Sequence, residues 1–248
     1  MADASARTTS VHPVPASMTT TEIHTLRADA AEWYSAALAG VAEALPSSLA
    51  LAERLLAPIA GEVWMGSLTL HGKTEPGSLE RSTRRVPDPV RAAVFLRDGF
   101  TCTYCGGRTI PRCVLVAISD VFPEAFPYYL HYRRGTVHPA FWALAPEADH
   151  VLAHANGGSS DLDNLTTLHA MCNTRKSSLE VGALPSPAAI PPDADAEWDG
   201  LISRYADIVI AGNDLGHRHA RPTYHLDWLR HFGLVADVAR VRAVAAKQ

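Results

Sequence analysis

Apolar residues in the first quarter of the chain recur every three or four positions, a spacing typical of helices with one buried face. A Thr19-x-x-Glu22 capping box predicts the start of the first helix, whose apolar face runs over 23–41. A Pro-Ser-Ser break at 46–48 ends it, and leucines within 49–58 predict a second helix. We therefore expect a helical N-terminal part.

Two shorter apolar segments favour strands. One is 62–70, which precedes a polar Gly/Pro-rich turn, and the other is 114–118. Between them, Pro89 is expected near the start of a helix. We expect Trp33 and Trp64 in the core rather than as base-stacking residues.

The C-terminal part returns to helical spacing after a Pro/Ala/Asp-rich linker at 183–196. Residues 198–210 predict an amphipathic helix, and 224–246 predict a further pair of helices. Several histidines lie here without an acidic or cysteine partner at ligand spacing, and we interpret them as surface residues. They are His217, His219, His225 and His231.

These patterns divide the chain into four parts. A Ser/Thr/Ala/Pro-rich tail at 1–18 is expected to be disordered, and 19–86 forms a helical N-terminal region. A central domain spans 87–184, and a helical region spans 185–248.

The central domain contains an insertion at 119–147 that is rich in aromatic residues and arginine. Aromatic rings interleaved with Arg133 and Arg134 are suited to base stacking and phosphate contact. The alternative, which the Phe-Pro and His-Pro spacing favours, is a structured insertion with its own small core.

Composition narrows the class of protein. The 248 residues, 47% of them hydrophobic, suffice for one substantial domain or a small one with extensions. No apolar run is long enough to span a bilayer, and the N-terminus does not resemble a secretory signal, so we expect a cytoplasmic protein without a membrane partner. Four cysteines, two of them in a CxxC, favour metal ligands in a reducing compartment.

The net charge of −4 argues mildly against nucleic acid as a partner. The charge is uneven, however, because residues 81–134 carry nine basic and four acidic side chains, a local +5. A modest basic patch beside the candidate metal ligands suits phosphate contacts.

Two short-spaced pairs of soft ligands predict a closed zinc site. They are Cys102 with Cys105, in a CxxC, and His169 with Cys172, in an HxxC. Structural zinc takes four nitrogen or sulfur ligands from two such pairs. Cys113 is the alternative to His169 as a ligand, although a buried free thiol is the interpretation we favour.

A second group of residues predicts an open site for a hard metal and a water. Asp149 and His150 are expected on a strand that leads to a Gly157-Gly158 turn. An imidazole titrates near neutral pH and suits a general base, and a carboxylate suits Mg²⁺ or Mn²⁺. Asn173, which follows the second zinc pair, completes this set.

Two segments together resemble the HNH endonuclease family. They are VRAAVFLRDGFTCTYCG at 90–106 and DHVLAHANGGSSDLDNLTTLHAMCNTRKSS at 149–178. The resemblance covers roughly 87–180 and implies a ββα-metal fold. We therefore expect an α+β protein, in which a small zinc-stapled ββα-metal centre is embedded in a mainly helical chain.

The resemblance also implies roles for single residues. His150 would be the general base, with Asp149 before it as a metal ligand. Asn164 would hold the loop and orient the base. Asn173 falls on the third motif position, which makes an H-N-N variant whose amide oxygen still binds the metal.

The same resemblance extends to DNA contacts and includes three departures, one of which is that the segment between the CxxC and Asp149 is longer than in compact members. Arg175 and Lys176 match basic helix residues that hold the DNA backbone. His169 stands where zinc-bearing members usually have Cys, and we assign it to zinc because one imidazole cannot serve both metals. His154 is a second imidazole near the site.

We therefore expect a metal-dependent HNH endonuclease that hydrolyses DNA, with structural Zn²⁺ and catalytic Mg²⁺ or Mn²⁺. The family suggests a restriction or defence setting. Because one HNH centre cuts one strand, double-strand cleavage implies two copies, as in a homodimer, or sequential nicking. The alternatives are a non-catalytic zinc-stapled module that binds DNA or protein, and an RNA-directed or toxin-type nuclease.

Overall fold

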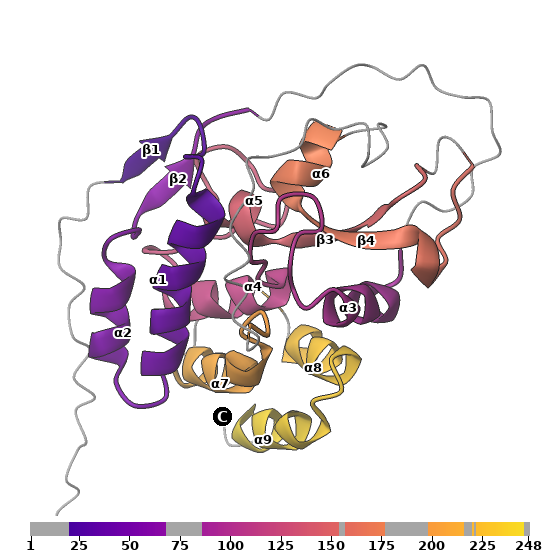
Figure 1. The fold of residues 1–248 in the computed structure, drawn as a ribbon. Coiled ribbons are helices and arrows are strands. Elements are labelled where there is room, and N and C mark those ends of the chain that lie inside the picture. The colour runs from indigo at the N-terminus through magenta and orange to yellow at the C-terminus, as the bar shows by residue number, and fades with distance from the viewer. Residues whose placement is uncertain are drawn as a thin grey trace, which may run out of the picture.

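The computed structural model describes residues 20–67, 86–153, 157–176, 198–215, 220 and 222–245. Within these ranges the chain is α+β, with helices around two small two-stranded sheets (Figure 1). This confirms the expected fold class. The predictions for the tail at 1–18, the linker at 183–196, His154, His217 and His219 lie outside the described residues.

The first described element is a strand rather than a helix, so the capping-box prediction is wrong. β1 (Thr21–Ile23) pairs in parallel with β2 (Glu62–Trp64). Because this ladder supplies hydrogen bonds to the backbone around Glu22, the helical pattern begins only at α1 (Ala30–Ala44). The predicted second helix is present as α2 (Leu49–Leu56), and it packs against α1.

The two tryptophans of this region differ in burial. Trp64 is 3% exposed and lies in the core, as predicted. Trp33 is 39% exposed, and the Arg27 guanidinium lies over its ring at 4.9 Å from the centroid. The core interpretation is therefore wrong for Trp33, whose ring is covered by a cation instead.

α3 (Asp88–Arg97) begins next to Pro89 as predicted, whereas 114–118 is helical rather than extended. It belongs to α4 (Arg112–Val121), in which every residue from Cys113 to Val121 is buried. A helix that is covered on all sides needs no polar face, so a short apolar run does not distinguish it from a buried strand.

The aromatic insertion has no core of its own. Phe126 and Phe141 belong to the main hydrophobic core, and Tyr132 packs on Phe141 and Trp142 at ring distances of 5.7 and 5.1 Å. α5 (Ala140–Leu144) carries the last two aromatic residues into that core. The expected separate core is therefore wrong, because these rings complete the main one.

Three helices form the described C-terminal part: α7 (Tyr205–Leu215), α8 (Pro222–His231) and α9 (Val235–Ala245). The predicted helix over 198–210 starts later than expected, after the 3₁₀ turn η4 (Ile202–Arg204), and the following pair of helices is confirmed. No helix in the described ranges is long and apolar enough to cross a membrane.

His225 is not the surface histidine that we expected. It is 4% exposed, and its Nδ1 lies 2.8 Å from the Tyr205 hydroxyl. Its Nε2 lies 3.2 Å from the Asp120 carboxylate. These contacts join α8 to α7 and α4, so the histidine has a structural role in the helical part.

A hairpin and a helix form the centre that the sequence motifs predict. β3 (Pro146–His150) pairs antiparallel with β4 (Leu165–His169), with Asp149 opposite Thr166. The 3₁₀ turn η2 (Leu162–Asn164) leads into β4, and α6 (Ala170–Lys176) follows it directly. In Figure 1, α6 lies above this hairpin and α3 lies below it.

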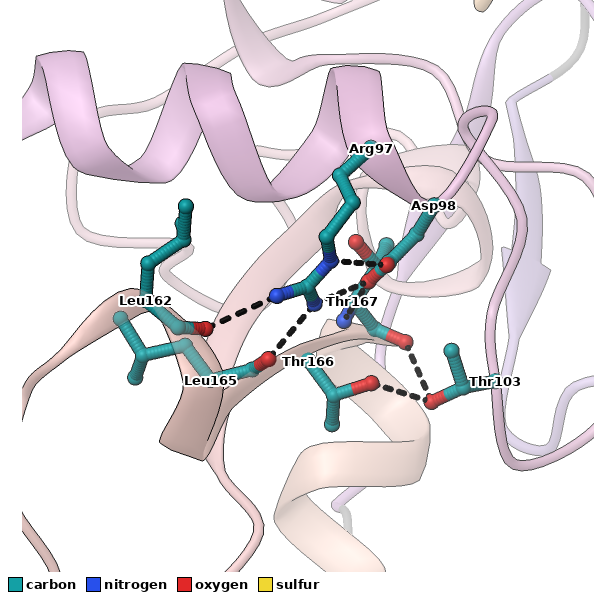
Figure 2. Close-up of polar contacts among 7 residues, drawn as sticks. All are labelled: Arg97, Asp98, Thr103, Leu162, Leu165, Thr166 and Thr167. Atoms are coloured by element: carbon teal, nitrogen blue, oxygen red, sulfur yellow. Dashed lines mark hydrogen bonds and ion pairs between the residues drawn. The ribbon is translucent and has the colours of Figure 1, made fainter.

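The end of α3 holds the free edge of β4, as Figure 2 shows. Arg97 donates hydrogen bonds to the carbonyls of Leu162 and Leu165, at 2.8 and 2.7 Å. Asp98 accepts one from the Thr167 amide at 2.8 Å and also pairs with Arg97. An unpaired strand edge is thereby satisfied without a third strand, and the hairpin is fixed to α3.

Candidate functional site

The four predicted zinc ligands form one compact cluster. The ligand atoms of Cys102, Cys105, His169 and Cys172 all lie within 4.8 Å of one another. His169 Nδ1 lies 3.3 Å from Cys105 Sγ and 3.8 Å from Cys172 Sγ. Three sulfurs and one imidazole nitrogen at this spacing fit tetrahedral zinc.

The surroundings of the cluster orient His169. Its Nε2 lies 2.8 Å from the Arg108 carbonyl oxygen, so Nε2 carries the proton and Nδ1 faces the sulfurs. Gly107 leaves room for this ring, because a Cβ there would lie 3.0 Å from His169 Cε1 and would crowd it. Gly106, directly after Cys105, closes the turn at φ +71°, a conformation that favours glycine, and its amide donates to the Cys102 carbonyl at 2.7 Å.

The protonation of the buried cluster is suited to a bound cation. Hydrogen bonds from the Cys105 and Cys172 thiols hold the pKa of Cys102 far below its usual range. Burial alone would lower the pKa of His169, but its contacts with Cys102 and then Cys105 raise that pKa to about 10. Zinc binding would therefore replace protons with a metal charge at the same place.

Cys113 is not part of the cluster. It lies fully buried in α4, and burial raises the pKa of its thiol to about 12. Of the two alternatives that the sequence left open, the structure favours His169 as the fourth ligand.

The acidic residue of the second site is paired with a buried lysine. Asp149, on β3, has 16% of its side chain exposed, and its Oδ2 lies 2.5 Å from Lys176 Nζ. The same ammonium donates a hydrogen bond to the His150 carbonyl at 3.0 Å. Lys176 is 1% exposed, so it holds the backbone and carboxylate of the Asp-His pair from inside the protein.

Asn164 closes the loop between β3 and β4. Its side-chain oxygen accepts a hydrogen bond from the Leu152 amide at 2.9 Å. Its NH₂ group donates to the carbonyls of Leu152 and Ser159, at 3.1 and 2.7 Å. The neighbouring Ser160 hydroxyl lies 3.0 Å from His150 Nε2. The loop therefore carries a direct contact to the imidazole.

Asn173 lies on the same side of the hairpin as Asp149. Successive strand residues alternate, so Glu147 and Asp149 share a face of β3. Asn173 and Lys176 are three positions apart on α6 and share a helix face. Glu147 and Asn173 line one pocket, while Lys176 contacts Asp149, so the two predicted metal ligands face the same gap between β3 and α6.

The predicted DNA-contacting residues differ in their placement. Arg133, Arg134 and Arg175 are exposed. Lys176 is buried against Asp149, so the geometry does not present its ammonium to a DNA backbone.

Sequence reasoning missed the residues that position the centre. Arg97 and Asp98 lie within the quoted motif, but nothing in their spacing shows that they hold β4. Arg112 pairs with Glu147 at 2.5 Å, and these two residues are 35 positions apart. Only packing brings such residues together.

Comparison with known families gives one match. Residues 142–179 match the family model described as HNH endonuclease. This span includes β3, β4 and α6 and confirms the resemblance over the hairpin and helix. Searches of curated proteins and of solved structures gave no match.

Proposed function

We propose that the protein is a metal-dependent endonuclease that hydrolyses DNA phosphodiester bonds at the centre formed by β3, β4 and α6. The observation that supports this proposal is that Asp149, on β3, and Asn173, on α6, lie on the two elements that Lys176 joins, with His150 next to Asp149 in the chain, within the segment that matches the HNH family. A general base next to two hard oxygen ligands is what this hydrolysis requires.

Asp149 and Asn173 are suited to hold Mg²⁺ or Mn²⁺. A carboxylate and an amide oxygen are ligands that these ions prefer. The Lys176 ammonium donates its hydrogen bond to Asp149 Oδ2, so Oδ1 is the oxygen that we assign to the metal ion. Such an ion supplies stabilisation of the charge on the phosphate and the leaving group.

His150 takes the proton of the attacking water in this proposal. The residue is 8% exposed, so it is largely shielded from solvent. Ser160 fixes its Nε2, and Asn164 fixes the loop that carries Ser160. Asn164 thereby acts as a positioning residue.

Lys176 is also a positioning residue. It joins the Asp149 carboxylate and the His150 backbone to the end of α6 by two hydrogen bonds. We therefore assign it to the Asp-His pair rather than to the DNA backbone. Three of the predicted DNA-contacting residues are exposed, and we propose that they bind phosphates of the DNA backbone: Arg133, Arg134 and Arg175.

Zinc has a structural role in this proposal. The cluster joins the turn at 102–105 to the end of β4 and to α6, which carries Asn173 and Lys176. Loss of zinc would release α6 from the hairpin. A cytoplasmic restriction or defence nuclease, acting as two copies where both strands are cut, is the setting that we propose.

The test compares substrates and metals on the full chain loaded with zinc. Plasmid DNA, single-stranded DNA and RNA are incubated with Mg²⁺, with Mn²⁺ and with EDTA. We expect metal-dependent cleavage of DNA, and loss of cleavage with retained DNA binding in His150→Ala. Preferred cleavage of RNA would support the RNA-directed alternative, and binding without cleavage would support the non-catalytic one. Equal cleavage in EDTA would refute the hard-metal mechanism.

A further inference from the structure

A pocket of about 350 Å³ opens beside Asn173. Its walls come from α6, from Glu147 of β3, from Trp142 of α5, from Arg112 at the start of α4, and from Tyr132 in an exposed turn. Glu147 precedes Asp149 by two residues, or about 7 Å along the strand. An occupant would therefore lie next to the reacting phosphate.

The charged groups in this pocket neutralise each other. The Arg112 guanidinium pairs with the Glu147 carboxylate at 2.5 Å and lies over the Tyr132 ring at 5.0 Å from its centroid. Glu147 receives a second guanidinium from Arg91 at 2.9 Å. A phosphate would have to compete with Glu147 for these cations, whereas a neutral planar group would not.

Three polar atoms of the pocket residues are buried without a hydrogen-bond partner. They are Arg112 Nε, Tyr132 Oη and Trp142 Nε1, out of five such side-chain atoms in the described ranges. Tyr132 Oη is near the Arg112 guanidinium, but the two do not form a well-aligned hydrogen bond. Burial raises the pKa of Tyr132, so its hydroxyl keeps its proton at neutral pH. The N–H groups of Arg112 and Trp142 are donors as well, so all three groups can donate a hydrogen bond.

The wall that carries Tyr132 has an unusual backbone. Tyr132 adopts φ +49°, a conformation that non-glycine residues rarely take. The turn is exposed, with Leu130 at 68%, and it also carries Arg133 and Arg134. Backbone strain of this kind gathers at ligand sites. The buried Tyr132 hydroxyl is carried by this turn, whereas Arg112 and Trp142 are held by α4 and α5.

We propose that this pocket receives one unstacked nucleobase of the substrate strand, next to the scissile phosphate, and so gives the nuclease a base preference. Aromatic walls suit a base plane, and three donors suit the carbonyl oxygens and ring nitrogens of a base edge. The exposed arginines of the turn suit the adjoining backbone. The inference rests on the proposed function.

The test sequences the cut ends of random-sequence DNA. We expect a preferred base at one fixed position beside the cut, and a loss of that preference by about threefold to tenfold in Tyr132→Phe and Trp142→Phe, each of which removes one donor and keeps a ring. Tyr129→Phe is the matched control, because Tyr129 is 43% exposed in the same turn and does not line the pocket.

A second measurement does not use the Tyr132 and Trp142 variants. An abasic nucleotide at the preferred position should weaken binding of the His150→Ala protein by a similar factor. Cleavage without base preference, or a preference unchanged in both variants, would overturn the pocket assignment and leave the nuclease intact. A chain that neither binds nor cuts DNA would overturn both. If a free nucleoside monophosphate bound here without altering base preference, the substrate-base assignment would also be wrong.

Discussion

The Lys176 ammonium lies 2.5 Å from the Asp149 carboxylate and is almost completely buried. The two residues are 27 positions apart, at the end of α6 and within β3. The ion pair therefore ties the helix to the strand at the point where we place the reaction.

Replacing Lys176 should impair the metal site more than DNA binding. In Lys176→Met, the Asp149 carboxylate and the His150 carbonyl lose the ammonium that joins them to the end of α6, so the carboxylate is no longer held in position. We expect cleavage to fall at least about tenfold, with the remaining activity requiring a higher metal concentration. Lys176→Arg should recover part of it.

Arg175→Met is the control for this experiment, because Arg175 is the exposed neighbour on the same helix. It should weaken DNA binding in a salt-dependent way and leave the metal requirement unchanged. If Lys176→Met behaved like Arg175→Met, the positioning role of Lys176 would be wrong.

Zinc binding should depend on three of the four cysteines, Cys102, Cys105 and Cys172. Cys172→Ser removes a ligand from the cluster, and we expect loss of the bound zinc and a fall in melting temperature of roughly 10 °C or more. Cys113→Ala, at the fully buried cysteine outside the cluster, should retain one zinc per chain. Atomic absorption and thermal unfolding measure both. Loss of zinc from Cys113→Ala with retention in Cys172→Ser would contradict the assignment.

The contact between α3 and β4 should contribute measurably to stability. Asp98→Ala removes the acceptor of the Thr167 amide and the partner of Arg97, and the side chain of Asp98 is only 11% exposed. We expect a loss of about 2 kcal/mol in unfolding free energy. Asp227→Ala breaks the exposed pair with Arg230 and should cost less than about 1 kcal/mol. Equal losses of unfolding free energy in the two variants, measured in urea, would mean that the contact between α3 and β4 does not contribute to stability.

His138 should make the protein sensitive to acid. Burial lowers its pKa to about 3 from 6.5, and its neutral ring bonds to the Ile59 carbonyl and the Ala140 amide. Below about pH 6.5, His138 is protonated in the unfolded chain but stays neutral in the folded chain until the pH approaches 3. Stability should therefore fall towards pH 3 by up to about 1.4 kcal/mol per pH unit from this residue.

Urea unfolding between pH 7 and pH 5 measures this effect. The Glu62 carboxylate, 3.7 Å from His138 Nε2, opposes it, but burial raises the pKa of Glu62 as well. His138→Gln should show a flatter dependence than the wild type, and His131→Gln, at an exposed position, should match the wild type. Because metal ligands also titrate, zinc content is checked at each pH. Parallel profiles for all three proteins would exclude His138 as the cause.

The sequence predicted the placement of residues well where one short segment determines their geometry. The CxxC and HxxC pairs gave the four members of the metal cluster, and the strand at Asp149 and the loop at Asn164 lie where their motif indicates. In each case a tight turn or a strand followed by a helix fixes the spacing, so few conformations are compatible with the pattern.

Packing decided what local pattern left ambiguous. The run at 114–118 fits a buried strand and a buried helix equally well, and the elements around α4 select the helix. The capping box at Thr19 was overridden because the backbone at 21–23 pairs with β2. The burial of Lys176, the Arg97 and Asp98 contacts with β4 and the pocket beside Asn173 depend on side chains from distant segments. Sequence spacing specifies which ligands can meet within a turn, whereas only the folded chain determines which distant charges and rings surround them.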